Sequence, residues 1–329
     1  MLHNSLATID GYPLNTKLRE QLVQAYERCS AIERQFIQLL AVLYEPVNRQ
    51  LILMCLDRLK ITAPNGNHFT LPILSVCLNP LLVNKLVIQE RTQGPRCHPL
   101  LREVALRDTI AAGSFEAIAH TVTQVRPVKP HWSKQGDNYE SEAQFIRDIR
   151  IALYAGDLAW LESCEQSFQA NYPYKTKISV DQIVCEVCNN PFDSEWLSTL
   201  PAEIQARALR SLLTTALNQC EPAHETFELL QNLCEDPESD EINADLACLY
   251  IEQLLIRGDW EAAQQVMSWL DEDYLDRLGA FQGWVRFWRG TWKGRSPPTA
   301  LHSRPTSRNA TNAKAFFKVS AAACSFWHC

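Results

Sequence analysis

Apolar residues recur three or four positions apart along almost the whole chain, whereas the strict alternation typical of β-strands is nearly absent. This is the spacing of helices with one buried face, so the sequence predicts a mainly α-helical protein. Ser30 and Glu33 form a capping box that marks one helix start. The first three predicted helices carry apolar residues at Leu18, Leu22, Ala25 and Cys29, at Ile32, Phe36, Leu39, Leu40 and Leu43, and at Leu51, Met54, Cys55 and Leu59.

The segment from Leu71 to Asp108 departs from this pattern. A helical run leads into "LVIQER", then the turn "TQGP", then a second short strand and a closing helix, which is the order of a winged helix. We therefore predict a winged-helix-like domain over residues 1–108. Pro80 is expected to kink or divide the first of these helices, with Asn79 available as a new cap.

Residues 109–293 repeat a short motif of glycine, then Ser, Asp or Thr, then a large apolar residue, between two helical runs. Glycine tolerates the left-handed conformation that ends a helix, and the polar residue can cap the next helix. Of the intervals of 43, 102 and 32 residues, the last is close to the ~34-residue period of tetratricopeptide (TPR) hairpins, and 102 fits three such units. The copies are Gly113-Ser114-Phe115, Gly156-Asp157-Leu158, Gly258-Asp259-Trp260 and Gly290-Thr291-Trp292.

These copies predict a TPR-like α-solenoid of degenerate helix hairpins over residues 109–293. In each hairpin the large apolar residue after the turn is expected to lie in the cleft between the paired helices. The proline-containing stretch at about 126–138 is interpreted as a linker loop or hinge. The alternative is that the four motifs are unrelated helix ends.

The net charge of −7 over 329 residues hides an asymmetry. Asp276 is the last acidic residue, and residues 277–329 hold nine Lys and Arg, which leaves about −16 on the rest of the chain. Such a body repels a nucleic-acid backbone. The chain has no signal-like start and no apolar run of ~18 residues, so we expect a soluble, cytoplasmic protein with no membrane contact.

One Cys-x-x-Cys pair, Cys185 and Cys188, suggests metal or redox chemistry, but a structural zinc site needs four ligands and no second pair follows. The pair is interpreted as the end of a helix capped near Ser179, with Cys188 buried among apolar neighbours and most of the twelve cysteines as core thiols. Phosphate-binding loops and nucleophile motifs are also missing. The sequence therefore predicts no catalytic residue, no cofactor, no metal and no enzyme activity.

The run "FQGWVRFWRGTWKGR" interleaves aromatic and basic residues, which can stack on and neutralise single-stranded nucleic acid. The alternative is a helix hairpin whose aromatic side chains pack inward. The predicted reading helix of the winged helix, Leu71 to Lys85, holds a single basic residue, so a protein-contact role is favoured there. The candidate nucleic-acid contacts are Trp284, Arg286, Trp288, Arg289, Trp292 and Lys293.

Residues 294–329 lose the helical period and contain no acidic residue. They are interpreted as an atypical, disordered basic tail, or as residues read out of the original frame at the end of a truncated protein.

Three stretches, "LVNKLVIQERTQGPRCHPLLREVALRD", "NNPFDSEWLSTLPAEIQARAL" and "RGDWEAAQQVMSWL", resemble the N-terminal accessory region of bacterial Swi/Snf-type DEAD/DEAH-box helicases. The resemblance covers residues 1 to about 293 and implies a winged helix followed by helical repeats that precede an ATP-dependent DNA motor. This chain lacks the motor motifs. The same order is similar to the MalT-like part of bacterial transcription regulators.

These observations favour a non-catalytic helical scaffold for protein–protein interaction, an accessory segment of a Swi/Snf-type helicase without its motor. Its expected partner is another protein. The alternative is a MalT-like nucleic-acid-binding regulator that acts through the winged helix or through the basic aromatic run.

Overall fold

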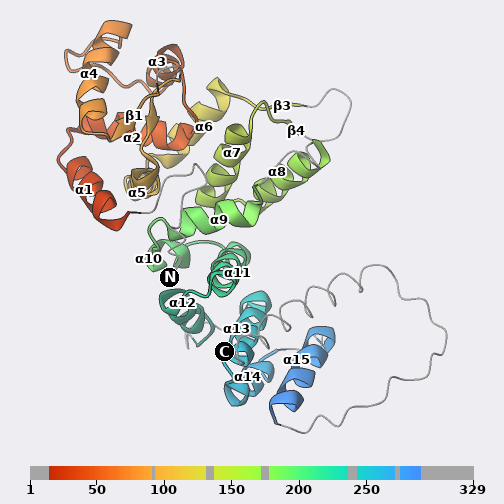
Figure 1. Cartoon of the computed structure of the whole chain (residues 1–329). Helices are drawn as coiled ribbons and strands as arrows, with labels where there is room; N and C mark the ends of the chain where they lie inside the picture. Colours follow the sequence, from red (N-terminus) through yellow and green to blue (C-terminus); the bar gives the residue numbers. More distant parts are fainter. Residues whose placement is uncertain are drawn as a thin grey trace. The chain divides into compact units, whose positions relative to one another are not determined.

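The structure is a computed structural model that describes residues 15–90, 93–130, 137–171, 178–235, 243–270 and 275–289. As predicted, it is mainly α-helical (Figure 1), with fifteen helices and two short strand pairs in these ranges. Contacts divide the chain into two compact units, Met1–Leu229 and Leu230–Cys329, which are described separately. Beyond the boundary predicted at residue 108, helix α6 (Phe115–Val125) packs on α2 (Ala31–Leu43) and α3 (Arg49–Arg58) within the first unit.

The elements follow one another along the chain with short connections. Their bounds are α1 Thr16–Glu27, α2 Ala31–Leu43, α3 Arg49–Arg58, α4 Leu71–Val83, β1 Val87–Ile88, β2 Arg96–Cys97, α5 Pro99–Ala111, α6 Phe115–Val125, β3 Lys129–Pro130, β4 Asp137–Asn138, α7 Glu142–Ala155, α8 Leu158–Asn171, α9 Val180–Asn189, α10 Ser194–Ser198, α11 Ala202–Gln219, α12 His224–Glu235, α13 Ala244–Ile256, α14 Trp260–Met267 and α15 Leu275–Trp288.

Helix α2 is the centre of the first unit. Every side chain from Phe36 to Leu43 is buried, and the helix contacts α4, α5, α6, α7 and β2. This part of the helix is buried on all sides, so it can be stable only inside a core. The capping box predicted at its start is confirmed: Ser30 Oγ accepts from the Glu33 N–H, and Glu33 accepts from the Ser30 N–H.

Helix α4 continues into a short antiparallel strand pair and then into α5. The register pairs Val87 with Cys97 and Ile88 with Arg96. The expected order of helix, strand, turn, strand and helix is therefore present, although residues 91 and 92 of the turn lie outside the described ranges. The expectation that Pro80 could divide the helix at Asn79 was wrong, since α4 runs unbroken through Pro80 to Val83.

The stretch interpreted as a linker contains paired backbone on both sides of residues 131–136, which are not described. Lys129 pairs with Asn138, and Pro130 with Asp137, in the two-residue strands β3 and β4. Strand β4 lies beside α8, which itself packs on α7. The described ends of this stretch are therefore held against the first unit.

Three of the predicted turn glycines lie between consecutive helices with positive φ, at 67° for Gly113, 66° for Gly156 and 81° for Gly258. Asp157 and Asp259 each accept a hydrogen bond from the first turn of the following helix. Ser114 does not cap in this way, because its hydroxyl donates to the Thr109 carbonyl. Phe115 is buried, Leu158 and Trp260 are half-buried, and Gly290, Thr291 and Trp292 lie outside the described residues.

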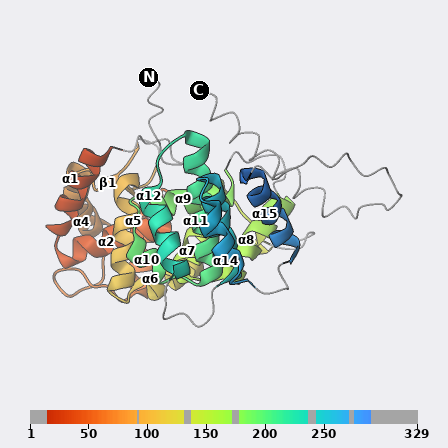
Figure 2. The ribbon, with the colours of Figure 1, turned by 90° about the horizontal axis from the view of Figure 1, so that it is seen from below.

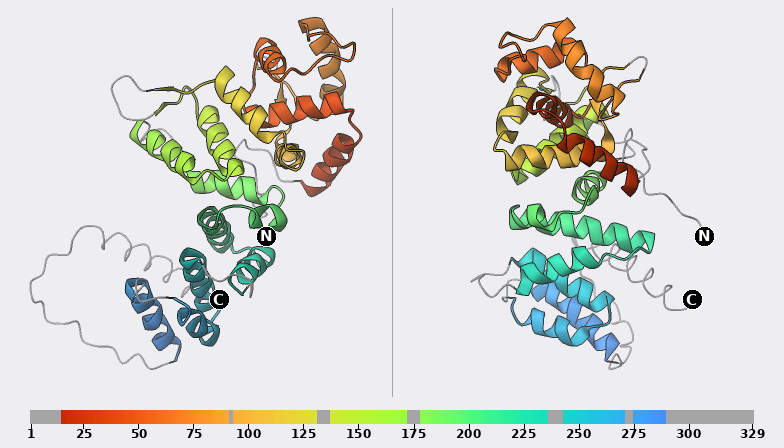
Figure 3. Two further views of the ribbon diagram at one scale, coloured as in Figure 1. Left: turned by 180° about the vertical axis from the view of Figure 1, so that it is seen from behind. Right: turned by 90° about the vertical axis from the view of Figure 1, so that its left-hand side faces the viewer.

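The second unit contains a three-helix cluster in which α13, α14 and α15 contact one another (Figure 3). Helix α13 is its most buried element, with Leu246 to Ile251 all buried. Trp288 Nε1 donates to the Leu255 carbonyl at 3.1 Å, which fastens the end of α15 to α13.

Two glycine substitutions distinguish backbone strain from side-chain contact. We expect Gly113→Ala to lower the free energy of unfolding by roughly 1–2 kcal/mol, because an added Cβ meets nothing within 4 Å and only the left-handed backbone is strained. Gly156→Ala should cost about 1 kcal/mol more, since its Cβ would lie 3.0 Å from Pro201 Cδ. Urea denaturation of the full chain measures both, and equal losses would contradict the contact with Pro201.

Candidate functional site

Buried charge gathers where the end of α2 meets α5 and α7. Arg150 of α7 donates from Nη1 to the Ala41 carbonyl at 3.0 Å and from Nη2 to Glu103 Oε1 of α5 at 2.8 Å. Ala41 lies in the last turn of α2, where carbonyls have no partner within the helix, and a cation there also meets the negative end of the helix dipole. Arg150 therefore joins three helices through one guanidinium group.

Aromatic rings complete this junction. The guanidinium groups of Arg102 and Arg150 lie 4.1 and 5.0 Å from the ring centroid of Tyr44, which ends α2 with φ 65°. The second oxygen of Glu103 accepts from Tyr154 Oη at 2.8 Å. Burial, together with the Glu103 charge, raises the pKa of Tyr154 far above its usual value. The buried carboxylate is thus fully engaged, and the phenol stays protonated.

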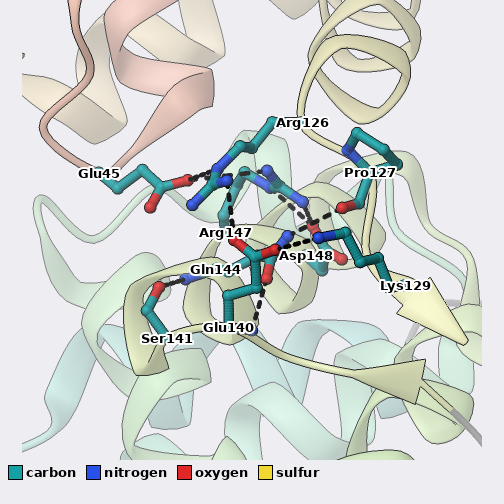
Figure 4. A network of polar contacts seen from close by, with 9 residues as sticks. All are labelled: Glu45, Arg126, Pro127, Lys129, Glu140, Ser141, Gln144, Arg147 and Asp148. Carbon is teal, nitrogen blue, oxygen red and sulfur yellow. Dashed lines mark hydrogen bonds and ion pairs between the residues drawn. The ribbon is translucent and has the colours of Figure 1, made fainter. Parts of the chain in front are cut away.

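A second network, shown in Figure 4, fastens the β3 segment to α7 and to the residue after Tyr44. Glu45 Oε1 accepts from Arg126 Nε at 3.2 Å and lies 3.9 Å from Nη1 of the buried Arg147. Arg126 Nη1 and Lys129 Nζ each donate to Glu140 at 2.9 Å. The hydrogen bond from Lys129 and the charge of Arg126 lower the pKa of Glu140. Positive and negative groups alternate along the network, so its charges neutralise one another.

Hydrogen bonds to the start of α7 extend this network. Ser141 Oγ caps α7 by accepting from the Gln144 N–H at 3.1 Å, and Gln144 Nε2 donates to the Pro127 carbonyl at 3.3 Å. Arg147 Nε donates to Asp148 Oδ1 at 2.7 Å, with both side chains buried. These contacts tie the stretch around Pro127 to α7, and they occupy the polar groups in structural roles (Figure 4).

His98 is a buried titratable group at the start of α5. Its Nδ1 accepts from the Leu100 N–H at 3.2 Å, which requires that this nitrogen carries no proton. Burial, followed by the charges of Arg102, Arg96 and Lys85, lowers the pKa of His98 to about 4. The neutral ring therefore serves as a helix cap at neutral pH.

The Cys185 and Cys188 pair lies at the end of α9, as predicted. Ser179 and Gln182 form a capping box at the start of this helix, and Cys188 is fully buried, which confirms its role in the core. Burial raises the pKa of both thiols, so neither is activated as a thiolate. Of the ten cysteines in the described ranges six are buried, namely Cys55, Cys97, Cys164, Cys188, Cys234 and Cys248.

The described residues bring together no group of three or more His, Cys, Asp or Glu side chains that could hold a metal ion. Within the same residues, no helix is long and apolar enough to cross a membrane.

The basic aromatic run does not form one continuous face. Trp288, which is 38% exposed, bonds to Leu255, and the guanidinium of the exposed Arg289 lies 4.5 Å from the centroid of the Trp260 ring, so both side chains also contact other helices of the second unit. Trp284 is half-buried, whereas Arg286 is exposed and Phe287 is 49% exposed. Trp292 and Lys293 lie outside the described residues. The run is thus divided between packing residues and surface residues.

The most apolar surface of the first unit lies on α4. Its buried side chains, Leu74, Leu78 and Leu81, face the core, while Val76 and Val83 on the opposite side are 69% and 80% exposed. In an amphipathic surface helix this side would carry charges, but α4 contains no charged residue at all. Single exposed apolar residues are common on protein surfaces, whereas contiguous apolar patches are rarer.

The buried arginines were not anticipated from the sequence. Arg147 and Arg150 stand in "FIRDIRIALY", where charged residues at helical spacing are typical of a solvent-exposed face. Arg147 is 0% and Arg150 2% exposed. The one available signal is that α7 has apolar residues on all sides, so its charged residues had to be buried with them.

Comparison of the chain with protein-family models, with curated proteins and with solved structures finds no match.

Two substitutions in the network of Figure 4 separate buried from exposed charge. Glu45→Gln removes the charge of the carboxylate that accepts from Arg126 and lies 3.9 Å from the buried Arg147, and we expect the free energy of unfolding to fall by about 1–2 kcal/mol, because Asp148 still neutralises Arg147. Glu140→Gln should change stability little, since its side chain is 36% exposed. Urea denaturation measures both variants, and a larger loss in Glu140→Gln would contradict this division.

The depressed pKa of His98 predicts a loss of stability in acid. The unfolded chain binds a proton near pH 6.5 but the folded chain only near pH 4, so stability is full above pH 6.5 and falls by roughly 3 kcal/mol towards pH 4. His98→Asn keeps a capping side chain and should flatten this part of the pH profile. Denaturation of both proteins between pH 4 and 8 provides the comparison, and parallel profiles would refute the assignment to His98.

Proposed function

We propose that the chain is a non-catalytic helical scaffold for protein–protein interaction, an accessory segment of a Swi/Snf-type helicase whose motor is not in this chain. In this proposal the first unit contains a winged-helix-like part and TPR-like hairpins continue along the chain. The resemblance of the three sequence stretches suggests the family. The order of α4, β1, β2 and α5, and the glycine turns at Gly113, Gly156 and Gly258, are consistent with both parts of the architecture.

The observation that carries the proposal is that the buried charged groups are paired within the protein, whereas an apolar surface is exposed. The buried charged groups Glu45, Glu103, Arg147 and Arg150 all face protein partners within the first unit. A ligand could bind these groups only after their contacts within the protein had been broken. The exposed face of α4, in contrast, is mostly apolar, and its side chains are left exposed by the described elements of its unit. An exposed apolar face is the surface type used to contact another protein.

The second candidate is a nucleic-acid-binding regulator with the order of a MalT-like protein. Arg286 and Phe287 support it, because a cation and an aromatic ring lie exposed in neighbouring positions of α15. Against it, Trp288 and Arg289 are engaged in packing. Binding driven by phosphate contacts would weaken steeply as salt is added.

Site-specific photo-crosslinking tests the scaffold. A photoreactive phenylalanine is placed at Val76, at Leu217 or at Phe287, which are exposed apolar positions of α4, α11 and α15. We expect a defined polypeptide to be crosslinked from at least one position in the source cells. In parallel, binding to single- and double-stranded DNA is measured at low and high salt. Salt-sensitive DNA binding without any crosslinked polypeptide would overturn the scaffold in favour of the regulator.

A further inference from the structure

The exposed residues of α4 lie on one side of the helix and are mostly apolar. Pro72, Val76, Asn79, Pro80 and Val83 are all exposed, and at 100° per residue they fall within one side of the helix, opposite the buried leucines. Asn79 is the single polar side chain among them. With a rise of 1.5 Å per residue, Pro72 to Val83 spans about 16 Å, which is three turns of a helix laid alongside. We call Pro72, Val76, Asn79, Pro80 and Val83 the α4 face.

The α4 face lies at the margin of the first unit. Helix α4 contacts α2, α3 and β1 on its buried side. In Figure 1 and Figure 2 it stands at the outer edge of that unit, beside α2. A partner helix can therefore approach the α4 face without displacing another described element of the unit.

Cations flank the α4 face, although the chain as a whole is acidic. Arg49 of α3 is held at one side of α4, where its Nη1 donates to Ser75 Oγ at 2.8 Å. Lys85 is exposed just beyond the end of α4. Of the acidic residues nearby, Asp57 lies 3.0 Å from His68 Nδ1, Glu90 pairs with Arg96, and Glu33 of α2 lies near Cys77, which is not part of the α4 face. Residues 49–90 hold four Lys and Arg against two Asp and Glu, whereas the whole chain carries −7.

We propose that the α4 face docks an acidic amphipathic helix of a partner protein, with its apolar side against Val76 and Val83 and its carboxylates towards Arg49 and Lys85. This rests on the proposed scaffold function and names the partner's chemistry. Helix-on-helix recognition uses apolar anchors at helical spacing, and complementary charges set orientation and choice of partner. A nucleic acid fits less well, because only Arg49 and Lys85 could meet its phosphates, and the α4 face itself offers one side-chain amide and otherwise apolar groups.

The probe is a synthetic fluorescent peptide of eighteen residues with Leu at positions i, i+3 and i+4 of each heptad and Glu at the others. Its controls are a scrambled peptide of the same composition and a version with Lys in place of Glu. Fluorescence anisotropy with the full chain should show saturable binding of the acidic amphipathic peptide alone. Equal binding of the scrambled peptide would overturn the proposal, because binding would then depend on the charge of the peptide and not on its apolar helical face.

Substitutions place the peptide on the α4 face. Val76→Glu and Val83→Glu replace highly exposed side chains, so folding should be retained, and each should weaken binding about tenfold, the equivalent of one buried valine. Leu217→Glu on α11 is a matched control at another exposed apolar position and should leave binding unchanged. Circular dichroism confirms that each variant is folded. If all three variants bind as the unchanged chain does, the α4 face is not the docking site.

A charge swap tests the cations. Lys85→Glu should weaken binding of the Glu peptide several-fold and strengthen binding of the Lys peptide, which a loss of folding cannot produce. Vesicles of phosphatidylglycerol and phosphatidylcholine, and single-stranded DNA, are tested in parallel. Binding to either that is lost in Val83→Glu, without binding of the peptide, would overturn the proposal. A polypeptide crosslinked at Leu217 or Phe287 but not at Val76 would leave the scaffold standing and remove this docking site.

Discussion

The first unit depends on how the carboxyl end of α2 is satisfied inside the core. Because the carboxyl-terminal part of α2, from Phe36 to Leu43, is buried on all sides, it can be stable only inside the core. Its last carbonyls are then out of reach of water, and each orphaned polar group would cost about 1–3 kcal/mol. Arg150 supplies the missing donor to Ala41 and brings its own charge into the core, where Glu103 neutralises it.

This arrangement holds the buried charged groups of the unit in structural contacts. A buried ion pair is costly to break, because the remaining charge is left without a partner in a medium of low dielectric constant. Glu103, Tyr154 and Arg150 therefore act as a fixed joint, and the network around Glu45 and Arg126 adds a second joint closer to the surface (Figure 4). An exposed apolar surface of the same unit lies on α4.

Local signals made much of the fold predictable. Ser30 with Glu33, and the helix start at Ser179, mark helix starts through contacts within three residues, so a sequence pattern contains all that is needed. The turn glycines are local in the same sense. By contrast, Arg150 bonds to Glu103, which is 47 residues away in the sequence, and to Ala41, which is 109 residues away. No short sequence pattern encodes such contacts. The prolines around Lys129 predicted a loop, whereas pairing with residues beyond the turn made short strands.

The distance in sequence between Ala41 and Arg150 has a consequence during synthesis. At 5–20 residues per second, a ribosome needs roughly 5–20 s to make the intervening chain. Throughout that time α2 has neither the donor for its last turn nor the packing of α7, while its apolar side chains have already been made. Helices α4, α5 and α6 can cover α2 as soon as they are made, but the last turn of α2 must wait these seconds for Arg150, and we expect this joint to form last among the contacts of α2.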